Sequence, residues 1–148
     1  MVISRLNLNK IQKDISLIQG YLSELREFEG MTESEFLSEK KNAAACESYL
    51  RRTLECVFDI SRHILAKTYG YKELEYKGIA RTLGEKGVVS EDFSNILVKM
   101  AGYRNRMVHL YREISDAELY QILQNNLTDI DRFIKEIALF LEKYNNSL

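Results

Sequence analysis

Proline is absent from the whole chain, and only seven of its 148 residues are glycine. Because proline is the strongest breaker of helices, its absence favours long uninterrupted helices. Apolar residues also recur at every third or fourth position through most of the sequence, which is the period of an amphipathic helix. We therefore predict an all-α fold, an up-and-down bundle of four to five helices that forms a single domain over residues 1–148.

Helix boundaries follow from the apolar spacing and from capping signals. The expected helices run from residue 4 or 7 to 28, from 32 to 67 with a break allowed near 40–42, from 77 to 85, from 91 through the motif described below, and from 116 to 144. Gly30 is expected to end the first helix. Thr32, Ser90 and Ser115 are expected N-caps, because each is a hydroxyl residue followed by acids at the start of an apolar pattern.

Charge and cysteine content narrow the class of protein. The formal net charge is −1. A protein that binds long nucleic acid over its whole surface is basic throughout, so the charge argues against that class of protein. Cys46 and Cys56 are ten residues apart on one expected helix, too far for a disulfide, and fit reduced packing residues. Neither a metal-ligand pattern nor a phosphate-binding glycine loop occurs, so no metal and no cofactor are expected. Without a membrane-spanning run or a signal peptide, we expect a cytoplasmic protein that does not bind a membrane. We also expect that it does not bind DNA.

The segment 103–111, YRNRMVHLY, carries the clearest chemical signal. The window 93–112 contains no acid, and its basic residues are Lys99, Arg104, Arg106, His109 and Arg112. Such an electropositive strip suits a phosphate, because arginine offers a fork of donors and histidine titrates near neutral pH. Arg104 and His109 lie roughly 140° apart around an ideal helix, so spacing alone does not place them in one site.

The pattern Arg104-Asn105-x-x-x-His109-x-Tyr111 resembles the motif of the HepT-like toxins, a branch of the HEPN ribonuclease superfamily. The segment 57–63, a glycine-containing linker and a long last helix follow in a similar order, so the resemblance covers nearly the whole chain. It implies an all-helical homodimer and a metal-independent site that cuts RNA at the dimer interface. It also implies a type VII toxin whose partner, a minimal nucleotidyltransferase antitoxin of the MntA type, attaches AMP to Tyr111.

Each residue of this motif is given a role under that hypothesis. His109 is the general acid and base, Arg104 stabilises the phosphate charge, and Asn105 holds the histidine ring or the scissile phosphate. Cleavage by the RNA 2′-hydroxyl needs both an acid and a base, whereas one chain offers one well-placed histidine. We therefore expect a symmetric dimer to supply two copies of each group, with Tyr111 lining the shared site.

Asp59 and His63 are open to more than one interpretation. Asp59 lies in an apolar sector and is a candidate supporting residue that orients His109 or pairs with Arg104. The alternative is a local pair with His63, which lies four residues further along the same expected helix. His63 fits a packing or pairing residue better than a catalyst.

Two alternatives concern larger features. Tyr69, Tyr71 and Tyr76 lie in or beside an expected loop, where they could stack RNA bases, although packing with hydrated hydroxyls is the commoner role. The competing function is a non-catalytic helical subunit that dimerises and serves as the binding or scaffold subunit of a minimal nucleotidyltransferase complex.

Overall fold

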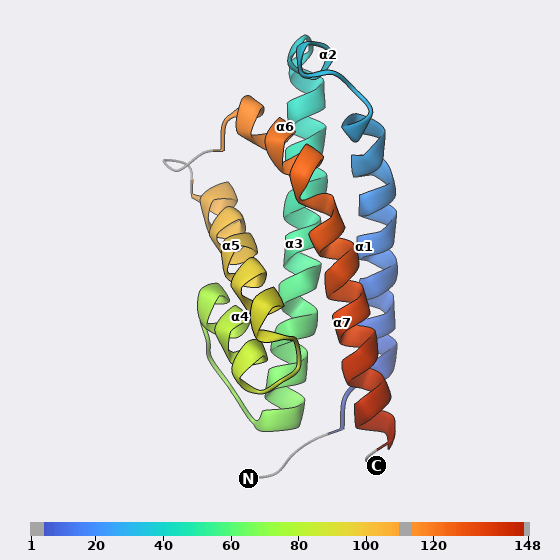
Figure 1. Ribbon diagram of the computed structural model, residues 1–148, viewed down its shortest axis with the longest axis vertical. Helices are drawn as coiled ribbons and strands as arrows, with labels where there is room; N and C mark the ends of the chain where they lie inside the picture. The colour runs from blue at the N-terminus through green and yellow to red at the C-terminus, as the bar shows by residue number, and fades with distance from the viewer. Residues whose placement is uncertain (1–4, 110–113, 147–148) are drawn as a thin grey trace.

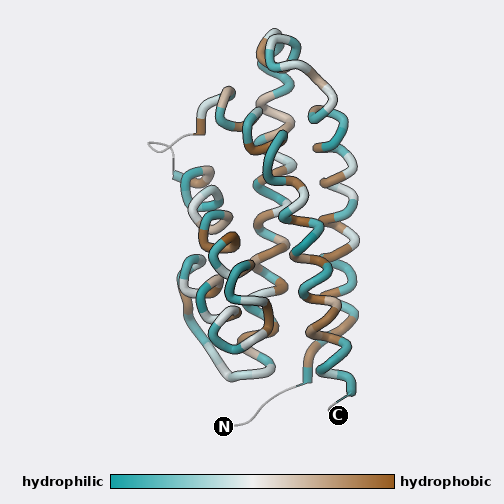
Figure 2. Tube along the Cα trace, viewed as in Figure 1, coloured by the Kyte–Doolittle hydropathy of each residue, from teal (hydrophilic) through white to brown (hydrophobic). Residues whose placement is uncertain are grey.

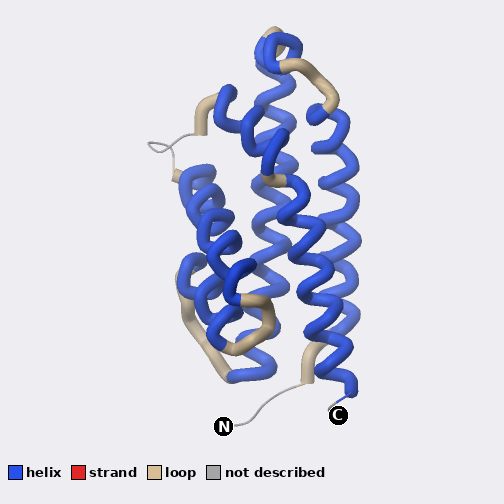
Figure 3. The backbone as a smooth tube through the Cα atoms, in the orientation of Figure 1, coloured by secondary structure: helices blue, strands red, loops and turns tan. Residues whose placement is uncertain are grey.

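The computed structural model describes residues 5–109 and 114–146. Within these ranges the chain forms seven α-helices, and every regular element is helical (Figure 3). The helices are α1 (Leu8–Glu29), α2 (Glu33–Leu37), α3 (Lys40–Tyr69), α4 (Tyr76–Glu85), α5 (Glu91–Val108), α6 (Asp116–Asn125) and α7 (Leu127–Asn146). The all-α prediction is confirmed. The predicted count of four to five was too low, because two of the expected helices are each divided in two.

Both divisions are made by polar residues at short turns. The second helical region stops after Leu37, slightly earlier than the predicted break at 40–42, and the amide of Asn42 donates to the carbonyls of Glu35 and Phe36. The last helix is interrupted at Asn126, whose backbone leaves the helical conformation at φ −121°. Figure 1 shows the consequence, since α6 crosses the top of α3 while α7 turns to run beside α1.

Three long helices, α1, α3 and α7, form the body of the bundle (Figure 1). α4 and α5 make a hairpin that packs against α3, and α2 lies against α3 and α6. Buried apolar residues from these helices form one core, and apolar positions recur along the helices in Figure 2. The largest fully buried side chains include Phe36, Phe58, Phe93 and Phe133, each from a different helix. Burying one such ring stabilises the fold by roughly 1.5–3 kcal/mol.

Both cysteines lie on α3 and are free and buried, as predicted. Burial raises the pKa of Cys46 to about 12 and that of Cys56 to about 11, so both stay protonated thiols at neutral pH. Within the described ranges, no cluster of three or more histidine, cysteine or acidic residues has the form of a metal site. No helix there is long and apolar enough to cross a membrane.

α4 and α5 approach each other closely because small residues face each other. A Cβ added at Gly84 would lie 2.5 Å from both Cβ and Oγ of Ser94, so the glycine is required by packing. The Ser94 hydroxyl donates to the carbonyl of Ala80 at 2.8 Å, which satisfies this buried group. The hairpin therefore holds α5 at a defined distance from α4.

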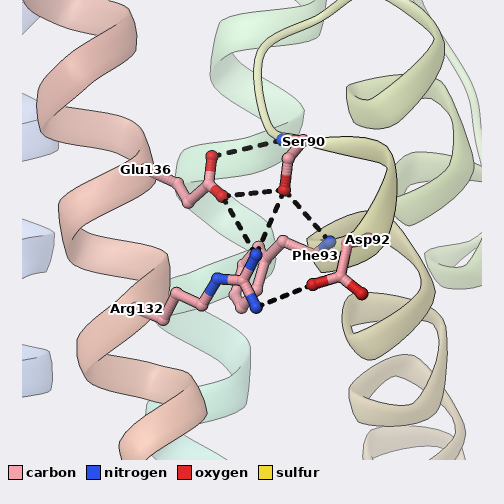
Figure 4. A network of polar contacts seen from close by, with 5 residues as sticks. All are labelled: Ser90, Asp92, Phe93, Arg132 and Glu136. Atoms are coloured by element: carbon pink, nitrogen blue, oxygen red, sulfur yellow. Dashed lines mark hydrogen bonds and ion pairs between the residues drawn. The ribbon is translucent and has the colours of Figure 1, made fainter.

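A polar network fixes the start of α5 to α7 (Figure 4). Ser90 caps α5 by accepting a hydrogen bond from the N–H of Phe93 at 3.2 Å, as its sequence position predicted. Its own N–H and hydroxyl donate to the carboxylate of Glu136 at 3.2 and 3.0 Å. Arg132 joins the network by donating to Ser90 and pairing with Asp92 at 3.0 Å. α5 is thus anchored at its first turn, which orients the motif at its other end.

Candidate functional site

The first part of the predicted motif, Tyr103 to Val108, lies in the last turns of α5, whereas the helix was expected to run through the whole motif. The helix ends at Val108, and His109 follows in an extended conformation with φ −102° and ψ 112°. The four-residue spacing of Asn105 and His109 would place both on one face of a continuous helix, but the helix stops before the histidine. Tyr111, the expected modification target, lies outside the described residues.

Arg104 is held by contacts on three sides of its guanidinium. Nε donates to a carboxylate oxygen of Glu55 on α3 at 2.8 Å, and the guanidinium carbon lies 3.8 Å from the centroid of the Tyr76 ring on α4. Nη1 reaches the side-chain oxygen of Asn105 at 3.5 Å, near the limit for a hydrogen bond. The arginine side chain is 19% exposed. These contacts fix the guanidinium group of a side chain that is still partly exposed, and a guanidinium fork suits binding of phosphate oxygens.

The expected pair between Asp59 and Arg104 is not observed. The carboxylate that binds Arg104 is Glu55, one turn earlier on α3, because α5 packs at the level of that turn. In the described part of the chain, Asp59 forms no ion pair with His63 either. Burial raises the pKa of the Asp59 carboxyl. Whether Asp59 orients His109 stays a prediction.

His63 has the pairing role that the sequence favoured, but with the backbone. Its Nε2 accepts a hydrogen bond from the N–H of Asn7 at 2.9 Å, which joins α3 to the start of α1. Burial, followed by the charges of Lys10 and Lys67, lowers the pKa of His63. The ring is therefore kept neutral, as an acceptor nitrogen requires.

Arg106 ties the end of α5 to the start of α6. Its two terminal nitrogens donate to both carboxylate oxygens of Glu118 at 2.6 and 2.7 Å. This bond lowers the pKa of the Glu118 carboxyl. The predicted capping box is half present, since Ser115 accepts from the N–H of Glu118 while the carboxylate turns to the arginine.

The electropositive strip is partly neutralised in three dimensions. The window 93–112 is free of acids in sequence, yet Glu55 and Glu118 reach two of its arginines from 49 and 12 residues away. Sequence reasoning missed both acids and the Tyr76 platform, because no local pattern signals a contact between distant helices. Helical spacing does place Glu55 on the same side of α3 as Asp59, the residue that was considered instead.

His109 is exposed and lines an open cleft of about 480 Å³. The walls come from the start of α3, the end of α5 and the start of α6, and they include Lys40, Met107 and Leu119. Arg104 instead faces α3 and α4, where Glu55 and Tyr76 hold it. Within one chain, His109 thus lines a cleft that does not include Arg104, and the two proposed catalytic groups contact different neighbours.

The tyrosines of the linker pack rather than extend into solvent. Tyr69 and Tyr71 are both partly buried against the core, and the amine of Lys86 lies 5.6 and 5.8 Å from their ring centroids. Tyr76 packs edge-on against Phe58, with ring centroids 5.3 Å apart. The packing interpretation is therefore confirmed for all three, and Tyr76 also contacts a motif residue.

Comparison of the sequence with known proteins gives matches along most of its length. Residues 18–137 match a family described as ribonuclease HepT-like. A protein named tRNA nuclease HepT, from Aphanizomenon flos-aquae, is 24% identical over 131 residues, which cover 88% of this chain and 89% of that protein. A protein named mRNA nuclease HepT, from Shewanella oneidensis, is 28% identical over 88 residues, 60% of this chain and 66% of that protein.

Solved structures share the fold. One is a tri-AMPylated HEPN toxin of Shewanella oneidensis in complex with an MNT antitoxin, with a TM-score of 0.79, 24% identity and coverage of 88% of this chain and 97% of that chain. Another is YutE, a cytosolic protein of unknown function from Bacillus subtilis, with a TM-score of 0.81, 22% identity and coverage of 96% and 95%. At these identities the likeness establishes a common helical architecture.

Proposed function

The chain belongs to the HepT-like ribonuclease family, and on that premise we propose that it is the toxin of a type VII toxin–antitoxin pair. It acts in the cytoplasm as an endoribonuclease that needs no metal ion. The observation that supports this proposal most directly is the end of α5, where Arg104 is fixed but partly exposed and His109 lines a cleft.

The proposed reaction uses the nucleophile that RNA itself carries. His109 takes the proton of the 2′-hydroxyl, whose oxygen then attacks the adjacent phosphorus and displaces the 5′-oxygen. Arg104 stabilises the negative charge that develops on the phosphorane, and Asn105 holds the histidine ring or the scissile phosphate. The leaving 5′-oxygen receives a proton from a second acid, which leaves a 2′,3′-cyclic phosphate on one fragment.

The second acid is proposed to come from a second copy of the chain. His109 and Arg104 contact different neighbours within one subunit, and a two-fold axis near this helix end would bring the histidine of one subunit toward the arginine of the other. The active species is then a homodimer with two His109 and two Arg104 around one shared cleft.

The proposed antitoxin is a minimal nucleotidyltransferase of the MntA type that attaches AMP to Tyr111. The similar Shewanella toxin is both AMPylated and bound to an MNT antitoxin. Tyr111 lies two residues after His109, close enough in sequence for a modification to reach the same cleft. A bulky adenylate with a negative phosphate would obstruct RNA and compete for Arg104.

The proposal is tested by RNA cleavage with purified protein in the presence of EDTA. We expect wild-type protein to cut RNA under these conditions, and His109→Ala to lower the rate by about 10²- to 10⁴-fold, the usual contribution of a general acid–base group. His63→Gln is the matched control, because it replaces the other histidine of the chain and should retain cleavage. Equal rates for wild type and His109→Ala would reject the assignment.

A non-catalytic scaffold is the second candidate. It is favoured by the fact that both motif arginines already bind acids of their own chain, Arg104 with Glu55 and Arg106 with Glu118. The two functions differ in the effect of expressing the chain without its partner. If expression arrests growth and Arg104→Ala or His109→Ala abolishes that arrest, the result supports the nuclease. Harmless expression of the unmodified wild type supports the scaffold.

A further inference from the structure

Tyr76 is the meeting point of two arginines that come from different helices. The guanidinium carbon of Arg104, on α5, lies 3.8 Å from the centroid of the tyrosine ring, and that of Arg62, on α3, lies 5.2 Å from the same centroid. Phe58 supports the ring edge-on from the core. The ring is therefore a fixed platform that holds two cations close together.

The distances to one centroid place an upper bound on the separation of the two cations. Their sum limits the two guanidinium carbons to about 9 Å apart, close enough for like charges to repel. Arg104 is compensated by Glu55, whereas Arg62 is exposed and forms no ion pair with an acid of the described ranges. Negatively charged groups bound at both arginines would offset this repulsion.

We propose that Arg62 is a second phosphate-binding residue, and that a single RNA strand lies along the face formed by Arg62, Tyr76 and Arg104. This inference rests on the proposed function, in which Arg104 binds the scissile phosphate. Arg62 then binds a neighbouring phosphate of the same strand, because the two guanidinium carbons are no more than about 9 Å apart. A planar fork presents paired donors to phosphate oxygens, which suits a strand whose sequence is not read.

Two features of the surface support a short contact with one strand. The chain has a net charge of −1, so affinity for RNA must come from a few local contacts. Glu55 and Asp59 lie on the same helix as Arg62, and the Asp59 carboxylate interacts electrostatically with that arginine. These acids disfavour a broad nucleic-acid footprint on this face.

The test measures binding of a short single-stranded RNA to protein that carries His109→Ala and does not cleave it. Adding Arg62→Ala is expected to weaken binding about tenfold and to reduce the slope of log K against log salt by about 0.7, the value for one lost phosphate contact on a single strand. Arg62→Lys, which keeps the charge, should recover part of the affinity. The matched control is Arg26→Ala, which removes one positive charge from the opposite side of the bundle, where Arg26 pairs with Asp131 between α1 and α7.

Kinetics in the otherwise wild-type protein separate this inference from the proposed function. Arg62→Ala is expected to raise KM more than it lowers kcat, whereas a loss of folding would show in the melting temperature. If wild-type protein cleaves RNA but Arg62→Ala binds it as tightly as Arg26→Ala, with the same salt slope, the inference is overturned and the nuclease proposal stands. If the wild-type protein does not cleave RNA but Arg62→Ala still weakens RNA binding, the nuclease proposal is overturned and Arg62 remains a phosphate-binding residue.

Discussion

Arg104 uses three different surfaces of one guanidinium group. Its Nε binds Glu55, its face lies on Tyr76, and Nη1 reaches Asn105. A fork fixed in this way loses less conformational entropy on binding a phosphate than a free side chain would. The same contacts join α3, α4 and α5, so the residue connects the stability of the hairpin to the chemistry proposed for the motif.

The hydrogen bond between Asn7 and His63 predicts a pH-dependent stability. The unfolded chain protonates this histidine below about pH 6.5, its ordinary pKa, whereas the folded chain resists protonation because its pKa is lowered. In that window the unfolded state binds more protons, so stability is fully present above the window and falls as the pH drops through it. The loss should be about 1 kcal/mol, the net value of one hydrogen bond.

Urea unfolding at several pH values between 5 and 8 measures this loss. His63→Gln cannot titrate, so the difference in unfolding free energy between wild type and this variant should shrink as the pH falls. A difference that stays constant over the range would contradict the assignment.

The motif residues could be identified from the sequence because Arg104, Asn105, His109 and Tyr111 follow one another at fixed local spacing. Their partners could not. Glu55 lies 49 residues before Arg104, and the choice between Glu55 and Asp59 depends on the height at which α5 crosses α3. That height is determined by packing of the α4–α5 hairpin, which helical periodicity does not reveal.

At the scale of elements, the α4–α5 hairpin requires a close approach of its two helices. It depends on a glycine at position 84, because any side chain would collide with Ser94 of the facing helix. Ser94 cannot move away freely, since its hydroxyl is buried and bonded to Ala80. The position of α5 against α4 therefore depends on the small residue at position 84.

Two glycine-to-alanine substitutions in helices should have opposite effects. Gly84→Ala is expected to destabilise the protein by about 1–3 kcal/mol, the usual cost of overpacking. Gly20→Ala lies inside α1, where an added Cβ meets nothing within 4 Å, so it should stabilise by about 0.5–1 kcal/mol through helix propensity. Unfolding free energies from urea titration measure both. A destabilising Gly20→Ala or a neutral Gly84→Ala would contradict the packing described for these helices.

Helix positions were predictable where the signal is local. Thr32, Ser90 and Ser115 cap helices at the expected places, because each hydroxyl bonds an N–H three residues later. The interruption at Asn126 was not predicted, since apolar residues keep helical spacing on both sides of it. The direction change between α6 and α7 depends on the helices against which each of them packs, and the apolar period does not contain that information.

For the whole molecule, the separation of the two proposed catalytic groups is the decisive feature. Arg104 faces α3 and α4, whereas His109 lines the cleft between α3 and α6. A chain acting alone would have to supply acid, base and phosphate stabilisation from groups that contact different neighbours at one helix end. In the proposed homodimer, two chains related by a two-fold axis would supply them around a single cleft, and activity would be a property of the pair.

Heterodimers with one altered subunit distinguish a shared site from two separate sites. Wild-type and His109→Ala chains carrying different affinity tags are co-expressed, and the mixed dimer is isolated by two purification steps. A shared site that needs one histidine as acid and the other as base should keep less than about 10% of the wild-type rate. Separate sites would keep about half, because one subunit of each dimer remains intact. A mixed dimer of wild type and His63→Gln should cleave at the full rate, so half activity with His109→Ala alone would show that each subunit cuts RNA independently.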